Sequence, residues 1–174
     1  QRKILTAVIN DLPEAEISVC LARKANCYRQ LLDEARSTIV YPNSLELLYA
    51  AKQQGMRIGL ASSSINAYYV LEIAGLKPLF DAIADGNQVC RSKPAPDIFV
   101  WVAGALGLRP DEIIVVEDSN AGIAGAKSAG MFAVGIEVHG SLTPPDVNLM
   151  MNELNFDQIV AQYSYAEKFL SDSG

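Results

Sequence analysis

The chain has 174 residues, half of them hydrophobic and a fifth charged, which is typical of one globular domain with room for a small appendage. Its 14 basic and 20 acidic residues give a net charge of -6 without a Lys/Arg cluster, so we expect no nucleic-acid partner. The apolar runs are too short to span a bilayer, and an acidic break interrupts the first of them, so we expect neither a signal peptide nor a membrane partner. We therefore expect a cytoplasmic protein.

The three cysteines are odd in number and lack C-x-x-C spacing. This pattern favours neither a disulfide framework nor a zinc site. We expect reduced thiols that lie mostly in the core.

Apolar residues at helical spacing predict one long amphipathic helix over residues 13–36. After Ser37, short apolar runs alternate with helical stretches, which is typical of an α/β fold with a mainly parallel sheet. The tail over 143–160 predicts loops and short helical pieces. The expected strands are "MRIGLA" (56–61), "FDAIAD" (80–85), "EIIVVED" (112–118) and "MFAVGI" (131–136), and the expected helices follow "YPNS", "SSS", "PAPD" and "VVEDS".

In an open α/β sheet the ligand lies outside the carboxyl ends of the strands, so polar residues just after strands are candidate site residues. Ser62, Ser63 and Ser64 follow the first expected strand and precede a helix. Hydroxyls and free backbone N–H groups at such a turn suit a phosphate oxygen. The alternative is an ordinary serine N-cap, which uses one hydroxyl.

Lys93 lies in the loop "SKPAPD", where two prolines stiffen the backbone after it. A rigid loop can direct an ammonium group at an anion. The alternative is a solvated loop lysine.

Glu117 and Asp118 end a run of four aliphatic residues. Two neighbouring carboxylates repel one another unless a cation lies beside them, and hard oxygen ligands of this kind suit magnesium. The alternative is that Asp118 or Ser119 caps the helix that begins near Asn120, which needs only one of the two. Together the hydroxyl turn, the lysine loop and the acidic pair predict a phosphate and metal pocket.

The segments "LASSS", "SKPAPDIF" and "VVEDSNAGIAGAKSAGM" resemble the second, third and fourth motifs of the haloacid dehalogenase superfamily, in its phosphatase and beta-phosphoglucomutase-like branch. The resemblance runs from about residue 3 to about residue 140. It implies a Rossmann-like core, a helical cap inserted after the first strand, Mg²⁺, and phosphoryl transfer through an aspartyl-phosphate. Residues 1–37 would be part of the cap and residues 38–174 the core.

The resemblance also implies roles for single residues in the reaction. Ser62 would hydrogen-bond the transferring phosphoryl group, and Lys93 would neutralise its charge and that of the nucleophile. Asp118 would hold Mg²⁺, with Glu117 as a further ligand or as a group that orients the ligands. Such sites work by positioning and by concentrating positive charge.

Substrate contacts are implied in the same way. Ser64 and Asn66 match positions that meet the other phosphate of a mutase substrate, and Lys24 matches a cap lysine that faces the site. Ser63, beside Ser64 in the same turn, is also expected to bind the substrate. Ile65 departs from the pattern, because many mutases have a lysine there. One cationic contact is therefore missing, which argues against mutase activity.

The first family motif, D-x-D, supplies the nucleophilic aspartate, and nothing in these 174 residues fills it, since no two aspartates are two positions apart. We expect the 174 residues alone to be inactive. Either upstream residues belong to the protein or the molecule is a fragment. We favour upstream residues, because a sheet built for burial on both faces would otherwise keep unpaired edges.

The leading hypothesis is a monomeric, Mg²⁺-dependent enzyme that transfers phosphoryl groups on small phosphorylated sugars, either as a phosphatase or as a mutase. A second hypothesis is a non-catalytic remnant that binds phosphorylated ligands without turnover. A third, a receiver-like or nucleotide-binding α/β module, explains the acids at the strand end but not "SKPAPDIF".

Overall fold

The computed structural model describes residues 13–35, 40–41 and 43–171. By its internal contacts the chain divides into two units, residues 1–39 and 40–174, each of which is described here by itself. The predicted boundary between residues 37 and 38 lies outside the described residues, so the assignment of 1–37 to a cap stays a prediction. None of the described helices is both long and apolar enough to cross a membrane.

The first unit contributes helix α2, Glu14–Glu34, in agreement with the helix predicted over residues 13–36. Pro13 lies at its N-cap position, where the missing N–H costs no helical hydrogen bond. The helix ends at Glu34, and the N–H of the C-cap residue Ala35 donates to the carbonyl of Leu31 at 3.0 Å.

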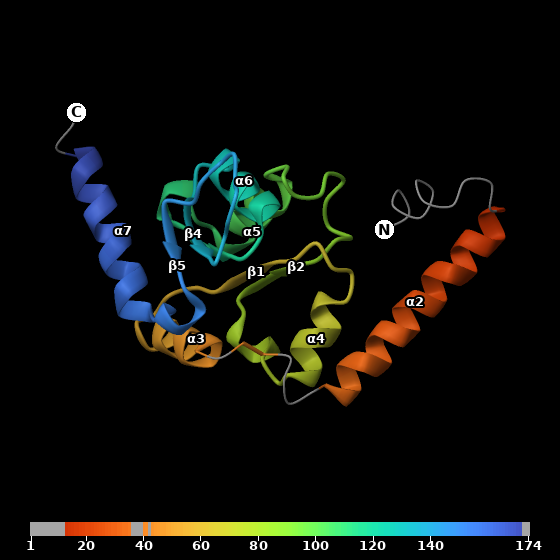
Figure 1. Ribbon diagram of the computed structural model, residues 1–174. Coiled ribbons are helices and arrows are strands. Elements are labelled where there is room, and N and C mark those ends of the chain that lie inside the picture. The colour runs from red at the N-terminus through yellow and green to blue at the C-terminus, as the bar shows by residue number, and fades with distance from the viewer. Residues whose placement is uncertain (1–12, 36–39, 42, 172–174) are drawn as a thin grey trace. The chain divides into compact units, whose positions relative to one another are not determined.

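The second unit is an α/β fold in which strands alternate with helices, as predicted (Figure 1). Single turns of 3-10 helix lie at Lys77–Leu79, Pro110–Glu112 and Met151–Glu153. The main elements, in chain order, are α3 (Ser44–Gln53), β1 (Gly59–Ala61), α4 (Ala67–Ile73), β2 (Ala82–Ala84), α5 (Asp97–Leu106), β3 (Ile114–Glu117), α6 (Asn120–Ser128), β4 (Phe132–Ile136), β5 (Val147–Leu149) and α7 (Phe156–Ser171).

The strands form two sheets, and every pairing is parallel. In the first, β1 pairs with β2, with Leu60 opposite Ile83. The second has the order β3-β4-β5, with Val116 opposite Val134. Within the described part of the chain, β1 and β3 each have a strand on one side only.

The core lies between the sheets and the helices α5 and α6. Ile98 of α5 and Ile123 of α6 are 1% and 0% exposed, and burying one such side chain stabilises the fold by about 1.5–3 kcal/mol. Gly125 lets the two helices approach, because a Cβ there would lie 2.9 Å from the ring of Phe99. The core therefore fixes α5, whose N-terminal end carries the lysine loop.

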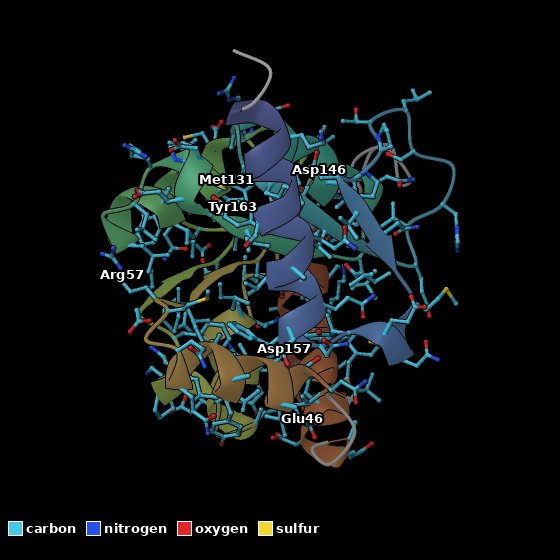
Figure 2. All side chains as sticks on the ribbon, turned by 90° about the vertical axis from the view of Figure 1, so that its left-hand side faces the viewer. Glu46, Arg57, Met131, Asp146, Asp157 and Tyr163 are labelled. Carbon is cyan, nitrogen blue, oxygen red and sulfur yellow. The ribbon has the colours of Figure 1, made fainter. Side chains whose placement is uncertain are left out.

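The tail differs from the prediction of loops and short helical pieces, which holds only for Met151–Glu153. It contains the strand β5 and the helix α7, which packs against α3 (Figure 2). Tyr163 of α7 meets the ring of Phe132 edge-on, with the ring centroids 5.4 Å apart. The strand is only three residues long, so no alternation marks it, and its existence depends on pairing with β4.

The cysteines also differ from the prediction, because all three are free and exposed. Cys20 and Cys27 lie on α2, and Cys90 lies in the loop before α5. All three lie among the described residues, and none of them belongs to the core.

Candidate functional site

The predicted site residues of the second unit lie at the carboxyl ends of strands. The serine turn follows β1, and the acidic pair lies at the end of β3. Ala61 at the end of β1 and Glu117 at the end of β3 line the same cavity, so the two strand ends face one space.

The serine turn is held by its own hydroxyls. The backbone N–H of Ser62 donates to the carbonyl of Ala84 in β2 at 2.9 Å. The Oγ of Ser62 accepts from the N–H of Ser64, and the Oγ of Ser64 accepts from the N–H of Asn66, both at 3.2 Å. The N-cap of α4 is Asn66, without a side-chain cap bond, so the alternative of a serine N-cap does not describe this turn.

Asn66 is buried, at 5% exposure, directly after the turn. In the described part of the chain its Oδ1 has no hydrogen-bond partner. A buried acceptor without a donor costs about 1–3 kcal/mol. A hydrogen bond to this oxygen, from a water or from an N–H or O–H group of a ligand, would therefore be stabilising.

Lys93 is not a solvated loop lysine. Its Nζ donates to the Oε2 of Glu117 at 2.5 Å, and the two side chains are 12% and 9% exposed. The same Nζ lies 4.9 Å from the ring centroid of Phe99, close enough for a cation–π interaction. The loop before α5 therefore fixes a cation at the end of β3.

Glu117 accepts hydrogen bonds at both oxygens. Its Oε1 accepts from the N–H and the Oγ of Ser119, at 3.1 and 2.7 Å, and its Oε2 accepts from Lys93. Burial raises the pKa of Glu117, but the charge and hydrogen bond of Lys93 and the hydrogen bonds of Ser119 together lower it by more. The pKa of Glu117 therefore lies below its ordinary value. The carboxylate is ionised at neutral pH.

Asp118 has the opposite shift. Burial and the hydrogen bond and negative charge of Glu117 raise its pKa above the ordinary value. The residue is nevertheless exposed, so its carboxylate can reach a ligand. Two carboxylates thus share one lysine, and a further cation beside Asp118 would relieve the repulsion between them.

A magnesium ion fits this arrangement. Among the described residues, no group of three or more His, Cys, Asp or Glu side chains could hold a metal. Mg²⁺ is commonly bound by one or two carboxylates together with waters and a substrate phosphate, so Asp118 alone suffices as a direct protein ligand. Both oxygens of Glu117 are already bonded, so Glu117 suits the orienting role better than that of a ligand.

Helix capping at the acidic pair is carried out by the residue after it. Helix α6 begins at Asn120, and the Oγ of Ser119 accepts from the N–H of Gly122 at 3.0 Å. The capping alternative therefore applies to Ser119, and neither Glu117 nor Asp118 is needed for it.

Lys24 lies on α2, in the other unit, and its side chain is exposed. Its predicted role facing the site stays a prediction, as do the roles of Ser63 and Ser64 toward a substrate. Ser63 is exposed at the tip of the turn.

Three residues that sequence analysis did not assign to the site hold its side chains in position. The Oγ of Ser119 orients Glu117, Phe99 lies under the ammonium group of Lys93, and Gly122 makes room for the Glu117 carboxyl. A Cβ at Gly122 would lie 2.0 Å from the Cδ of Glu117. The glycine in "EDSNAG" could have revealed this, because glycine in the first turn of a helix permits close approach by another group.

Comparisons with known proteins identify the family of the chain. A model of the haloacid dehalogenase-like hydrolases matches residues 2–130. The chain is 38% identical to the beta-phosphoglucomutase of Bacillus subtilis over 122 residues, which cover 70% of this chain and 54% of that protein. It is 32% identical to the protein CbbY of Rhodobacter capsulatus, over 70% of this chain and 55% of that protein. The chain thus spans about half the length of these two curated relatives.

A solved structure shows the same fold. The crystal structure of beta-phosphoglucomutase from Clostridium difficile has a TM-score of 0.83 and 35% identity, over 89% of this chain and 70% of that chain. The parallel sheets with their flanking helices match this relative. The chain belongs to the haloacid dehalogenase-like hydrolases.

Proposed function

We propose that the protein transfers phosphoryl groups on small phosphorylated sugars, with Mg²⁺ and through an aspartyl-phosphate, as a phosphatase or as a beta-phosphoglucomutase-like mutase. One observation carries the proposal: the buried pair of Lys93 and Glu117 places a cation beside the exposed Asp118 at a strand end. Positive charge concentrated at one point is what a transferring phosphoryl group requires.

Each residue has a chemical part in this proposal. The hydroxyl of Ser62 donates a hydrogen bond to an oxygen of the phosphoryl group, and Lys93 balances the charge that the group carries during transfer. Asp118 would hold Mg²⁺, which supplies further positive charge at the phosphoryl oxygens. Glu117 holds the ammonium group of Lys93 in place through the 2.5 Å contact.

The nucleophile is proposed to come from polypeptide outside residues 1–174. These residues contain no two aspartates two positions apart, so they lack the D-x-D motif that the family resemblance implies. Residues 1–174 alone are therefore proposed to bind phosphate without turnover.

Relatives support a sugar phosphate as the substrate class. They include the two beta-phosphoglucomutases and the fructose-1-phosphate phosphatase YqaB of Escherichia coli, which is 39% identical over 48% of this chain. A solved relative, CbbY of Rhodobacter sphaeroides, is in complex with xylulose-(1,5)bisphosphate, at 25% identity and a TM-score of 0.67.

The second candidate is a protein that binds phosphorylated ligands without turnover. The same absence of D-x-D from residues 1–174 favours it. It makes the same prediction for phosphate binding but excludes turnover in any form of the protein, so an activity measurement separates the two.

The phosphate site is tested first by binding. Inorganic phosphate is titrated into residues 1–174 with MgCl₂, and the amide signals of the polypeptide are followed by NMR. We expect shifts at Ser62 to Ser64 and at Asp118, and binding at least tenfold weaker in Lys93→Ala. The matched control is Lys77→Ala, which removes an exposed lysine from the 3-10 turn Lys77–Leu79. Unchanged signals at the serine turn would refute the site.

A coupled assay then separates the two reactions in protein that carries a D-x-D strand. Glucose 6-phosphate formed from beta-glucose 1-phosphate indicates a mutase, and free phosphate alone indicates a phosphatase. The exposed Ile65, which stands where many mutases have a lysine, argues for the phosphatase.

A further inference from the structure

The loop between β2 and α5, residues 85–96, begins beside the serine turn and carries Lys93 near its end (Figure 1). The N–H of Ser62 donates to the carbonyl of Ala84, the last residue of β2, at 2.9 Å. Because β1 and β2 are parallel neighbours, the residues that follow β2 lie beside those that follow β1. The loop therefore connects the two parts of the site that would contact a phosphate.

Asp85, the first residue of this loop, carries a buried carboxyl group. The residue is 5% exposed, and none of the ion pairs formed by the described residues includes it. Aspartate is rarely buried unless it is paired, and a buried polar group must be held by hydrogen bonds. The hydrogen bonds of Asp85 therefore indicate what the residue does in the fold.

These hydrogen bonds close a tight turn, Asp85–Gln88, which we call the Asp85 turn. The Oδ1 of Asp85 accepts from the N–H of Asn87 at 2.8 Å, as aspartate does in turns of this kind. The N–H of Asp85 donates to the Oε1 of Gln88 at 2.6 Å, and the N–H of Gln88 donates to the carbonyl of Asp85 at 3.2 Å. Three hydrogen bonds thus hold the four residues together.

The Asp85 turn contacts the serine turn through Gly86. The N–H of Gly86 donates to the carbonyl of Ser64 at 3.4 Å. A Cβ at Gly86 would lie 2.6 Å from the carbonyl oxygen of Ser63, which is too close for any side chain. Glycine therefore allows a backbone approach that another residue would prevent.

Space alone requires this glycine. The φ of Gly86 lies outside the left-handed region, whereas that of Gly75, for example, is +69°. An alanine at position 86 would thus be opposed by the carbonyl of Ser63 and not by its own backbone conformation. Both contacts of Gly86 are with carbonyl oxygens, and an anion is bound by donors, so these contacts would not compete with a phosphate.

We propose that Asp85 and Gly86 are positioning residues of the phosphate site, which set where the serine turn lies relative to Lys93. The Nζ of Lys93 is held separately by Glu117, so a displaced Asp85 turn would move the serine turn past a cation that stays in place. The role in phosphate binding rests on the proposed function. The support of the serine turn rests only on the contacts of the Asp85 turn.

The first test changes the contact at Gly86. Amide NMR spectra of residues 1–174 are recorded without phosphate and then during titration with inorganic phosphate and MgCl₂. Gly86→Ala should shift the signals of Ser62 to Ser64 before phosphate is added, and it should weaken phosphate binding about tenfold or more. Asn87→Ala is the matched control at the next position. Its side chain is exposed and its N–H can still donate to Asp85, so both readouts should stay unchanged.

The second test changes the acceptor at Asp85. Asp85→Ala removes the oxygen that bonds the N–H of Asn87, so it should shift the serine-turn signals and weaken phosphate binding about tenfold or more. Asp85→Asn keeps an oxygen at this place, so binding should return to within about twofold of the wild type. Urea unfolding of each variant, and the signals of the distant strand β5, separate this local effect from a general loss of stability.

Two results would overturn the proposal. One is a Gly86→Ala variant with wild-type serine-turn signals and wild-type phosphate binding. The other is an Asp85→Asn variant as impaired as Asp85→Ala. If Gly86→Ala does not fold, the comparison of the two Asp85 variants decides alone. A wild type that binds no phosphate would contradict the proposed function, while the signals recorded without phosphate would still show whether the Asp85 turn positions the serine turn.

Discussion

Lys93 and Glu117 form an ion pair that is almost wholly removed from water, at 12% and 9% exposure. Such a pair adds little net stability over apolar residues, but removing one partner leaves a buried charge. The pair is therefore better explained by the site than by stability, because it holds an ammonium group at a strand end.

Lys93→Met should lower the free energy of unfolding by about 3 kcal/mol at pH 7, because Glu117 would stay buried without its cation. The loss should shrink toward pH 4.5, since Glu117 can then take up a proton. Urea unfolding at the two pH values measures both effects. The control is Lys52→Met, which breaks the more exposed pair with Asp81 and should cost much less. Equal losses in the two variants would contradict a special role for Lys93.

The two carboxylates give opposite dependences on pH. The pKa of Glu117 is lowered, so its contribution to stability is present above its unfolded pKa and is lost as the pH falls through the folded pKa. The pKa of Asp118 is raised, so its contribution is present below its unfolded pKa and is lost as the pH rises through the folded pKa. At neutral pH an ionised Asp118 therefore destabilises the fold.

Asp118→Asn should accordingly be more stable than the wild type at pH 7 without Mg²⁺, and the gain should be smaller at pH 4.5. With Mg²⁺ at ten times its dissociation constant the wild type should gain about 1.4 kcal/mol, and the variant should gain much less. Thermal unfolding with and without MgCl₂ measures this. If the variant gains as much stability from Mg²⁺ as the wild type does, Asp118 is not a ligand of the metal.

At the scale of elements, α6 is fitted to the end of β3. Ser119 caps the helix and also bonds Glu117, and Gly122 in its first turn leaves room for the Glu117 carboxyl. The residues that start the helix thus also set the position of the Glu117 carboxyl. A change in the first turn of the helix should therefore alter the geometry of the site.

Gly122→Ala should destabilise the protein and weaken phosphate binding at least tenfold, although alanine alone favours a helix by about 1 kcal/mol over glycine. Its Cβ would lie 2.0 Å from the Cδ of Glu117, so the carboxyl must move away from Lys93. Gly104→Ala is the matched control: it lies exposed on α5 with nothing within 4 Å of the added Cβ, and it should stabilise by about 0.5–1 kcal/mol. Urea unfolding measures the change in stability of each variant, and phosphate titration measures the change in binding. A Gly122→Ala variant that is more stable than the wild type and binds phosphate equally well would contradict the role of Gly122 in the site.

Much of the fold followed from the sequence, and the parts that did not depend on contacts distant in the chain. The four expected strands and the helix starting at Asn120 are present because each has a strong local pattern. Strand β5 has three residues and depends on β4, and α7 depends on packing against α3 and Phe132. The roles of the site residues stay predictions, and the 2.5 Å contact between Lys93 and Glu117 could not be predicted, because the two residues are 24 positions apart in the chain.

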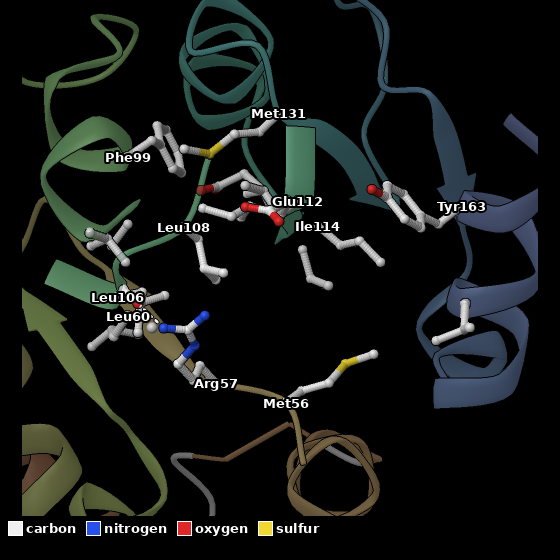
Figure 3. A pocket seen from close by; sticks show the side chains of 18 of the residues that line it. Met56, Arg57, Leu60, Phe99, Leu106, Leu108, Glu112, Ile114, Met131 and Tyr163 are labelled. Carbon is white, nitrogen blue, oxygen red and sulfur yellow. Dashed lines mark hydrogen bonds between the residues drawn. The ribbon is translucent and has the colours of Figure 1, made fainter. Parts of the chain in front are cut away.

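At the scale of the whole molecule, β1 and β3 line one cavity, and the site lies where these two strands end (Figure 3). The nucleophile of the proposed reaction is not among the residues that meet there. If the proposed function holds, activity should therefore appear only in protein that carries the D-x-D motif.

The most direct measurement of the proposed function is turnover of beta-glucose 1-phosphate with MgCl₂, by residues 1–174 and by a longer protein that carries a D-x-D strand. We predict no turnover by residues 1–174 alone, and release of phosphate or formation of glucose 6-phosphate by the longer protein. Lys93→Ala should abolish the activity of the longer protein, and N-x-N in place of D-x-D should give none. A longer protein that binds phosphate but turns over neither this nor another sugar phosphate would contradict phosphoryl transfer at this site.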